Sequence, residues 1–201
     1  SVMFVEIAQG SPFNRGLLIA KKDLVNYINP KEPLYRSMYL YNEEAKKVAD
    51  ANKTVKGFNG IRAIDKILID IDKEKNTDEY TQQKAQAVIM HLEELGVEQH
   101  SIQPFFSGTG YHITIPNSVF NFSPSTDLPY VVKYTMEHLF DDIGIDSSVY
   151  IRTGIYRVQH TLNQKTGLYK IPISMSELMN CKAKTILELA KTPRIGYPYT
   201  E

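Results

Sequence analysis

The chain has 201 residues, 42% of them hydrophobic, with 23 Lys and Arg against 23 Asp and Glu, and it is long enough to bury one sizeable core. Its mean hydropathy is −0.30 and no apolar run approaches about twenty residues, so composition excludes a membrane-spanning protein. A single cysteine, Cys181, excludes an internal disulfide framework and a cysteine-rich zinc site, and favours a reducing, cytoplasmic environment.

The charges are unevenly placed along the chain. Residues 65–98 carry nine acidic side chains against four lysines, whereas residues 151–201 carry eight Lys and Arg against three Glu. An acidic centre beside a basic C-terminal third suits a site that holds cations and polyanions together. Solvated surfaces with chance clustering would give the same distribution, so charge alone leaves both interpretations open.

Local patterns in the first part of the chain predict a mixture of strands and helices. Pro30 would end an early short helix, and Asn42 is well placed to cap a second one. A run of Ile and Leu around two aspartates is typical of a buried strand. The expected elements are a strand at 2–8, a short helix at 21–28, a strand or helix start at 37–41, a helix at 42–53 and a strand at 67–72.

In the second part of the chain, Thr77 would cap a long helix and Gly96 would stop it. The apolar face of this helix would carry Ala85, Val88, Ile89, Leu92 and Leu95. The other expected elements are strands at 102–106 and 111–116, short β segments near 149–150 and 168–173, and helices at 129–140, 174–180 and 183–191. This order indicates an α+β fold with antiparallel hairpins around the acidic strand.

The strand at 67–72 reads ILIDID and carries two carboxylates. Because side chains alternate along a strand, Asp70 and Asp72 project from one face, and the isoleucines line the other. Their repulsion, which burial increases, predicts that the pair holds a divalent cation or shares a proton. Mg²⁺ or Mn²⁺ would suit such oxygen ligands. The alternative is an edge strand with one aspartate directed at solvent.

The segment 105–115 reads FFSGTGYHITI and is expected to form a hairpin. Gly108 and Gly110 would let the backbone approach a ligand, and their N–H groups with the Ser107 hydroxyl would cup a phosphate. His112 lies two residues after the turn, where its ring would donate to a phosphate oxygen. The alternative interpretation of this segment is an ordinary hairpin with a histidine on the surface.

Two further segments carry charges that suit a polyanion site. Asp146 ends a short apolar run, so a strand would bring it close to Asp70 and Asp72. The alternative for Asp146 is a capping or turn role. Asp141 and Asp142 resemble surface residues at the end of a helix. Segment 152–173 places basic side chains among tyrosines and would hold a triphosphate or a nucleic-acid backbone. Its NQKTG run is equally compatible with a plain hairpin turn.

Together these motifs, in this order, resemble those of the archaeo-eukaryotic primase superfamily, which includes primase small subunits and primase-polymerases. The first motif of that family is an apolar strand ending in DxD or DxE, and it corresponds to ILIDIDKE here. The second is a Ser-x-His hairpin, here SGTGYH, and the third is an apolar-Asp motif, here IGID. A downstream segment like SLHxKTG corresponds to TLNQKTG, and the matches span residues 67–173.

The resemblance implies a two-lobed α+β catalytic domain, with antiparallel or mixed sheets flanked by helices and an RRM-like catalytic lobe. It implies one primase-polymerase domain over 1–201, with an N-terminal lobe at about 1–60, a catalytic lobe at 61–173 and C-terminal helices at 174–201. The chain begins at Ser1 without methionine, and we expect it to be a fragment of a longer protein.

The resemblance also assigns residues to roles. The metal-binding and catalytic carboxylates would be Asp70, Asp72 and Asp146, holding two Mg²⁺ or Mn²⁺ ions, and no zinc site is expected. The nucleotide contacts would be Ser107, Gly108, Gly110, His112, Arg157, Asn163, Lys165 and Arg36. The nucleic-acid contacts would be Arg152 and Lys170. Asn163 departs from the family pattern, which usually has His or Lys at that place, so this contact would be made differently.

The expected activity is transfer of a nucleotide from an NTP or dNTP to a 3′-hydroxyl on a single-stranded DNA template. The expected partners are template, primer and a replicative helicase domain or accessory subunit. The expected location is the cytoplasm of a prokaryotic cell, with the protein encoded by the cell, a virus or a plasmid, and the alternative location is a nucleus. One rival is a catalytically silent, nucleic-acid-binding replication-initiator module on the same fold. Another is a metal-dependent nuclease or a DxD glycosyltransferase.

Overall fold

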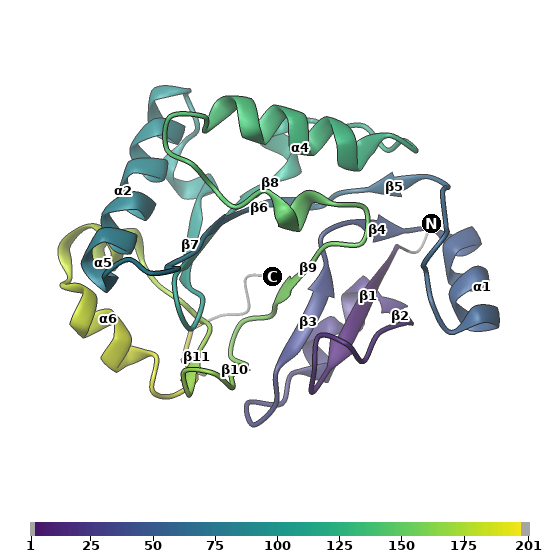
Figure 1. Ribbon diagram of the computed structural model, residues 1–201, viewed down its shortest axis with the longest axis horizontal. Helices are drawn as coiled ribbons and strands as arrows, with labels where there is room; N and C mark the ends of the chain where they lie inside the picture. Colours follow the sequence, from purple (N-terminus) through teal and green to yellow (C-terminus); the bar gives the residue numbers. More distant parts are fainter. Residues whose placement is uncertain (1–2, 198–201) are drawn as a thin grey trace.

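The computed structural model describes residues 3–197, which form an α+β protein with antiparallel sheets and several helices (Figure 1). The strands are β1 (Phe4–Gln9), β2 (Leu17–Ala20), β3 (Leu34–Ser37), β4 (Leu40–Tyr41), β5 (Arg62–Ala63), β6 (Lys66–Ile71), β7 (Gln103–Phe106), β8 (Tyr111–Pro116), β9 (Ile155–Arg157), β10 (Leu162–Asn163), β11 (Leu168–Tyr169) and β12 (Ile171–Pro172). The helices are α1 (Glu43–Asn52), α2 (Asp78–Glu94), α3 (Asn117–Phe120), α4 (Leu128–Leu139), α5 (Met175–Asn180) and α6 (Ala183–Leu189), with short 3-10 helices η1 (Lys21–Tyr27), η2 (Gln99–Ser101) and η3 (Ser148–Tyr150).

A few sequence predictions fall outside the described part. Residue 2, expected at the start of the first strand, and residues 198–201 of the expected C-terminal segment are not described. Within residues 3–197, every helix is too short or too polar to cross a membrane.

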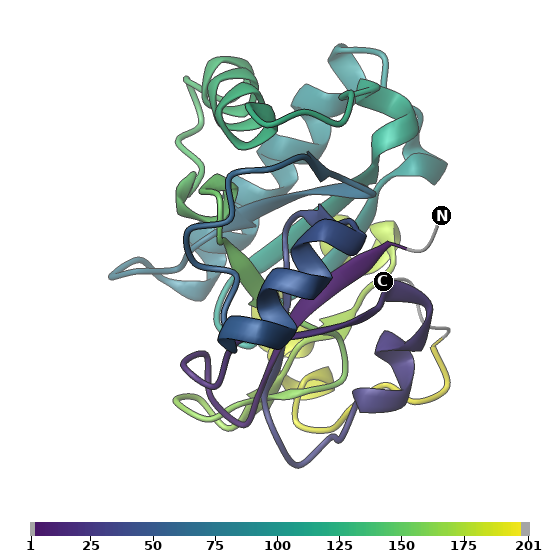
Figure 2. The same cartoon turned by 90° about the vertical axis from the view of Figure 1, so that its right-hand side faces the viewer.

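The first sheet has the strand order β5-β4-β1-β3-β9, and β2 also pairs with β1. Strand β9 comes from far along the chain, and its Arg157 lies opposite Tyr35 of β3. Helix α1 packs against β2 and β4 on the outer face of this sheet (Figure 2). The sheet therefore joins the expected N-terminal lobe, residues 1–60, to β5 and β9 from the segment expected to form the catalytic lobe.

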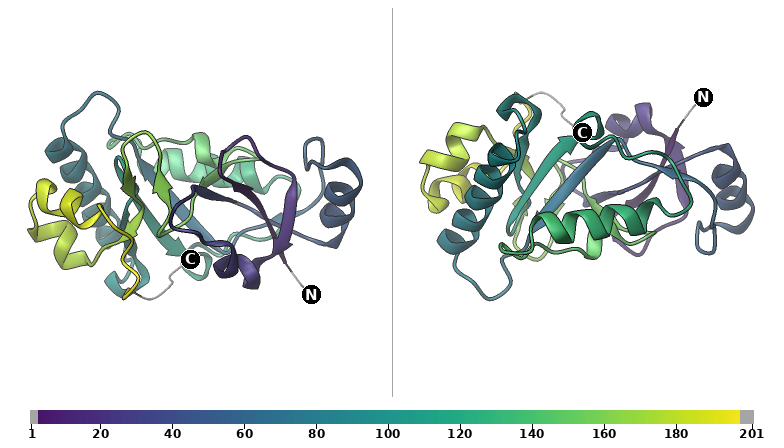
Figure 3. Two further views of the ribbon diagram at one scale, coloured as in Figure 1. Left: turned by 90° about the horizontal axis from the view of Figure 1, so that it is seen from below. Right: turned by 90° about the horizontal axis from the view of Figure 1, so that it is seen from above.

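The second sheet has the order β12-β7-β8-β6, with all neighbours antiparallel. Ile67, Leu68 and Ile69 are completely buried, because helices α2 and α4 contribute to a core that covers this sheet. Figure 3 shows α4 lying across the strands when the molecule is seen from above. In the register of β6 with β8, Asp70 lies opposite His112, so the acidic strand and the hairpin are already one unit.

The helix boundaries follow the expected caps. The side chain of Asn42 accepts a hydrogen bond from Ala45 N at the start of α1, and that of Thr77 accepts one from Tyr80 N at the start of α2. Leu95 was predicted on the buried face of the long helix, which is wrong: α2 ends at Glu94, and Leu95 is 48% exposed beyond the last packed turn.

The β segment predicted near residues 149–150 is also wrong. Residues Ser148–Tyr150 form the 3-10 helix η3. Tyr150 is completely buried there, and its hydroxyl donates to the carbonyl of Leu68 at 2.7 Å. The aromatic and β-branched residues that suggested a strand therefore pack against the edge of β6.

Candidate functional site

Three aspartates from two distant segments meet at the end of β6. Asp70 and Asp72 lie on either side of Ile71, and Asp146 comes from the loop after α4. The N–H of Asp146 donates to the carbonyl oxygen of Asp70 at 3.0 Å, which forms an antiparallel bridge between the two residues. One carboxylate oxygen from each of the three side chains lies within 4.8 Å of the others. The predicted proximity of Asp146 to the first pair is confirmed.

The environment of these carboxylates disfavours three negative charges. Burial, and then the charge of Asp146, raise the pKa of Asp70 to about 7; burial and the charge of Asp70 raise that of Asp72 to about 8. Burial also works to raise the pKa of Asp146, but hydrogen bonds from Asp72 and from the Ser148 N–H outweigh it and lower this pKa. The cluster therefore favours a retained proton or a cation. Its all-oxygen donors fit Mg²⁺ or Mn²⁺.

The hairpin between β7 and β8 lies close against the acidic strand. A methyl group at Gly110 would lie 2.2 Å from the carbonyl oxygen of Ile71, so only glycine permits this approach. Gly108 has φ +101° and faces the side chain of Asn163. The amide of Gly110 was predicted to bind a phosphate, but in this structure it donates to Ser107 Oγ at 3.0 Å. Gly110 therefore serves the close packing of the hairpin.

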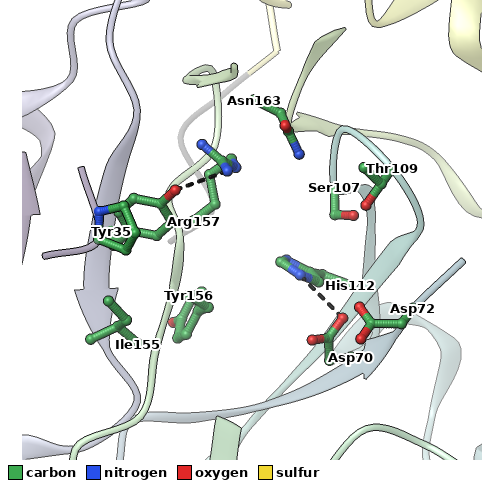
Figure 4. A pocket seen from close by; sticks show the side chains of 11 residues that line it. Tyr35, Asp70, Asp72, Ser107, Thr109, His112, Ile155, Tyr156, Arg157 and Asn163 are labelled. Atoms are coloured by element: carbon green, nitrogen blue, oxygen red, sulfur yellow. Dashed lines mark hydrogen bonds and ion pairs between the residues drawn. The ribbon is translucent and has the colours of Figure 1, made fainter. Parts of the chain in front are cut away.

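His112 lies between the acidic strand and the other wall of the site. Its Nε2 atom is 3.5 Å from Asp70 Oδ1, and the residue is only 7% exposed. Its ring meets the ring of Tyr156 edge-on, with centroids 6.4 Å apart. Figure 4 shows His112 and Ser107 on the same side as Asp70 and Asp72, facing Tyr156 and Arg157 across the cavity.

The opposite wall is built from β9, β3 and β10. The guanidinium of Arg157 lies 4.8 Å from the centroid of the Tyr35 ring and donates to the Tyr35 hydroxyl at 3.0 Å and to the carbonyl of Leu162. Asn163 Oδ1 accepts a hydrogen bond from Lys165 N, and the amide group of Asn163 points into the cavity (Figure 4). Arg157 and Asn163 are therefore held in place before any ligand binds.

These walls enclose a cavity of about 320 Å³. Its lining residues are Pro12, Tyr35, Asp70, Asp72, Ser107, Thr109, His112, Ile155, Tyr156, Arg157 and Asn163. An adjoining cavity of about 570 Å³ shares part of this lining and adds Lys165. Asp72 also lines a third cavity, of about 300 Å³, and Asp146 lines this third cavity beside it. The structure thus brings the three carboxylates, Ser107, His112, Arg157, Asn163 and Lys165 into one region.

Arg36 was predicted to contact a nucleotide, but the structure places it elsewhere. It is completely buried, and its guanidinium makes two hydrogen bonds, of 2.9 and 3.1 Å, with the carboxylate of Asp65. Burial alone would raise the pKa of Asp65, but Arg36 and Lys21 hold it below the usual range. Arg36 therefore forms a structural ion pair and does not line the cavity.

The two predicted nucleic-acid contacts also lie outside the cavity. Arg152 is exposed and donates to Asn59 Oδ1 at 2.7 Å. Lys170 is completely buried: its Nζ donates to the carbonyl of Arg157 at 2.8 Å and lies 4.5 Å from the centroid of the Phe105 ring. The prediction for Lys170 is wrong, because a nucleic-acid phosphate has no access to this ammonium.

The sequence did not single out Tyr35, Thr109 or Pro12, which line the cavity. Tyr35 directly precedes Arg36, which the resemblance did single out, but only the pairing of β3 with β9 brings Tyr35 to Arg157. Thr109 was not named as a site residue, but it lies inside the SGTG turn, and that motif could have pointed to it.

The sequence matches no protein-family model, and no curated protein matches it either. The function of this site is therefore inferred from its geometry and chemistry.

Proposed function

We propose that the protein is a nucleotidyltransferase of the primase-polymerase type, which transfers a nucleotide from an NTP or dNTP to a 3′-hydroxyl on a single-stranded template. The observation that carries the proposal is the pairing of two chemistries in one cavity. Asp70 and Asp72, with Asp146 beside them, offer carboxylates suited to divalent cations, and His112, Arg157 and Asn163, which line the same cavity as Asp70 and Asp72, are suited to phosphate oxygens. The charges of a nucleoside triphosphate with its bound cations are complementary to these groups, because the cations suit the carboxylates and the phosphate oxygens suit the hydrogen-bond donors.

Asp70, Asp72 and Asp146 would hold the Mg²⁺ or Mn²⁺ ions, for which their oxygen donors and their mutual repulsion are suited. When bound, two such ions lower the pKa of a 3′-hydroxyl and stabilise the leaving pyrophosphate. Asp146 is positioned by its backbone bridge to Asp70, so the three ligands keep their spacing.

The remaining residues would bind and orient the triphosphate. His112 and the Ser107 hydroxyl donate hydrogen bonds to phosphate oxygens from the hairpin side. Arg157, already fixed by Tyr35 and Leu162, adds a positive charge that needs no reorganisation as negative charge builds up. Asn163 donates through its amide, and Lys165 adds charge from the adjoining cavity.

The finer fold assignment belongs to the same proposal. β6, α2, β7 and β8 form a split β-α-β unit in which β8 lies between β6 and β7, and this unit supports an RRM-like catalytic lobe. The last strand, β12, pairs with β7 and leaves β6 at the opposite end of the sheet. We also propose single-stranded DNA template and primer as partners, with a helicase domain or accessory subunit, and action in the cytoplasm.

Incorporation of a labelled nucleotide on unprimed and primed single-stranded DNA, with Mg²⁺ or Mn²⁺, tests the proposal. We expect extension products from the wild-type protein and at least about a thousandfold less from Asp70→Asn, because one metal ligand is lost. Asp142→Asn is the matched control, since Asp142 is an exposed carboxylate outside the cavity, and it should retain full synthesis.

Three results would contradict the proposal. Near wild-type synthesis by Asp70→Asn would remove the metal role of the cluster. Binding of single-stranded DNA with no incorporation under any condition would favour the silent initiator module. Degradation of the DNA, or transfer from a nucleotide sugar, would favour a nuclease or a glycosyltransferase.

A further inference from the structure

A phenylalanine stands exposed at the mouth of the adjoining cavity. Phe13 lies in the loop between β1 and β2, is 90% exposed, and lines the cavity of about 570 Å³. The lining of this cavity also includes the cationic side chains of Arg157 and Lys165. An exposed aromatic ring thus shares a cavity with two cationic side chains.

The loop that carries Phe13 is fixed by hydrogen bonds at several points. Ser11 Oγ accepts from the N–H of Phe13 at 3.1 Å, and Asn14 Nδ2 donates to the carbonyl of Gln9 at 3.0 Å. Further along, Arg15 forms an ion pair of 2.6 Å with Glu6, which is 1% exposed. Phe13 is therefore presented to solvent by an anchored loop, and its ring is available at a defined place.

The loop is also anchored to the rest of the molecule. Arg15 donates to the carbonyl of Thr153 at 2.8 Å, which lies just before β9. At Gly16, with φ +98°, a Cβ would lie 2.1 Å from the carbonyl oxygen of Lys53, so this end of the loop packs directly on the chain after α1. The distance between Phe13 and the β9 wall is therefore set by direct contacts.

The two cavities are continuous through shared lining residues. Tyr35, Arg157 and Asn163 line both, together with Pro12 and Thr109. A triphosphate held between the carboxylates and Arg157 would therefore lie next to the second cavity, whose lining includes Lys165 and Phe13. The charged side chains of the cavities thus suit the phosphates of a nucleotide, and the apolar ring of Phe13 suits its base.

We propose that Phe13 is the stacking surface for the base of the incoming nucleoside triphosphate. This inference rests on the proposed function, because the triphosphate position is taken from it. Every base has a π-face, so stacking on a single ring would hold all four nucleotides without selecting among them. Gln164 and Ser11 line the same cavity and offer polar groups that would meet the edge of the base.

The test compares ligands with and without a base, in the presence of Mg²⁺. Affinities of the wild-type protein for ATP, CTP and inorganic tripolyphosphate are measured by calorimetry, alongside Phe13→Ala and Phe13→Trp. We expect Phe13→Ala to bind both nucleotides roughly tenfold more weakly, because one base-stacking contact is lost. Tripolyphosphate affinity should not change, and Phe13→Trp should restore nucleotide binding.

Tyr130→Ala is the matched control, because Tyr130 is an aromatic residue of α4 that is 75% exposed and lies outside both cavities. Equal nucleotide affinity in Phe13→Ala and wild type would overturn the stacking role. A loss confined to single-stranded DNA would overturn it as well, and would assign Phe13 to the template. A Phe13-dependent nucleotide affinity in a protein that incorporates no nucleotide would support the subsite while contradicting the proposed function.

Discussion

At the scale of single residues, Lys170 decides how the acidic cluster is tolerated. Its ammonium works to lower the pKa of Asp70, against burial and the charge of Asp146, which raise it. The rings of Phe105 and Tyr156 lie 4.5 and 5.0 Å from this ammonium and shield it from water. This buried ammonium offsets part of the repulsion among the carboxylates without a bound metal ion.

Replacing Lys170 by Met tests this role. The variant leaves the carbonyl of Arg157 without its charged donor, so we expect the free energy of unfolding in chelator to fall by about 2–3 kcal/mol in urea titrations. Mn²⁺ should stabilise this variant more than the wild type, because a competing positive charge has been removed. Lys184→Met is the control, since Lys184 is exposed on α6.

The same variant separates the buried role from the nucleic-acid role that the sequence predicted. Single-strand affinity falls with rising salt with a slope of about −0.7 for each phosphate contacted. Lys170→Met should leave this slope unchanged, because the ammonium does not reach the surface. A shallower slope would mean that Lys170 contacts the nucleic acid after all.

At the scale of elements, the site depends on how closely the β7–β8 hairpin approaches the end of β6. Ser107 and Gly110 exchange backbone and side-chain hydrogen bonds across the turn, so the turn moves as one body. Thr166 Oγ1 donates to the carbonyl of Gly108 at 2.8 Å, which ties the β10–β11 turn to the same hairpin. A shift of the hairpin would therefore move the proposed phosphate-binding groups together.

Gly110→Ala tests the approach of the hairpin. Its methyl group would meet the carbonyl of Ile71 at 2.2 Å, so we expect a loss of about 1–3 kcal/mol in the free energy of unfolding. Nucleotide affinity should fall as well, because Ser107 and His112 move with the hairpin. Gly196→Ala, where a Cβ would meet nothing within 4 Å, is the control for both measurements. An unchanged affinity would show that the hairpin does not hold the nucleotide.

At the scale of the whole molecule, the pKa values of Asp70 and Asp72 link stability to pH and to metal. Both lie above the ordinary value of 3.8, at about 7 and about 8, so the folded protein holds protons that the unfolded chain releases. The stability that these protons contribute is fully present below about pH 4 and is lost as pH rises to about 8. A bound divalent cation would replace them at neutral pH.

Melting curves in chelator at about pH 5 and about pH 8 measure this linkage. Between these two pH values the melting temperature of the wild type should fall more than that of Asp70→Asn, because the amide at position 70 has no proton to release and only Asp72 still does. Adding Mg²⁺ or Mn²⁺ should raise the melting temperature of the wild type more at the higher pH. Identical pH dependence in the wild type and Asp70→Asn would show that the cluster does not retain protons.

The sequence by itself determined the features that depend on neighbouring residues. The caps at Asn42 and Thr77, the alternation along β6 and the turn at 107–110 are all local, because they follow from backbone hydrogen bonds and side-chain period within a few residues. The two carboxylates of the acidic strand, which offer oxygen ligands to a cation, are also visible within a few neighbouring residues. A divalent-cation site could therefore be predicted from a short stretch of the sequence.

Only the tertiary structure decided which charges face the cavity. Arg36, Arg157 and Lys170 are all basic residues on or beside strands, yet only Arg157 lines the cavity, because β9 pairs with β3 and not with its sequence neighbours. Pairing between segments more than a hundred residues apart leaves no local pattern, since its free energy comes from packing that exists only in the folded chain. The burial of Lys170 and the arrival of Tyr35 at the site have that same physical origin.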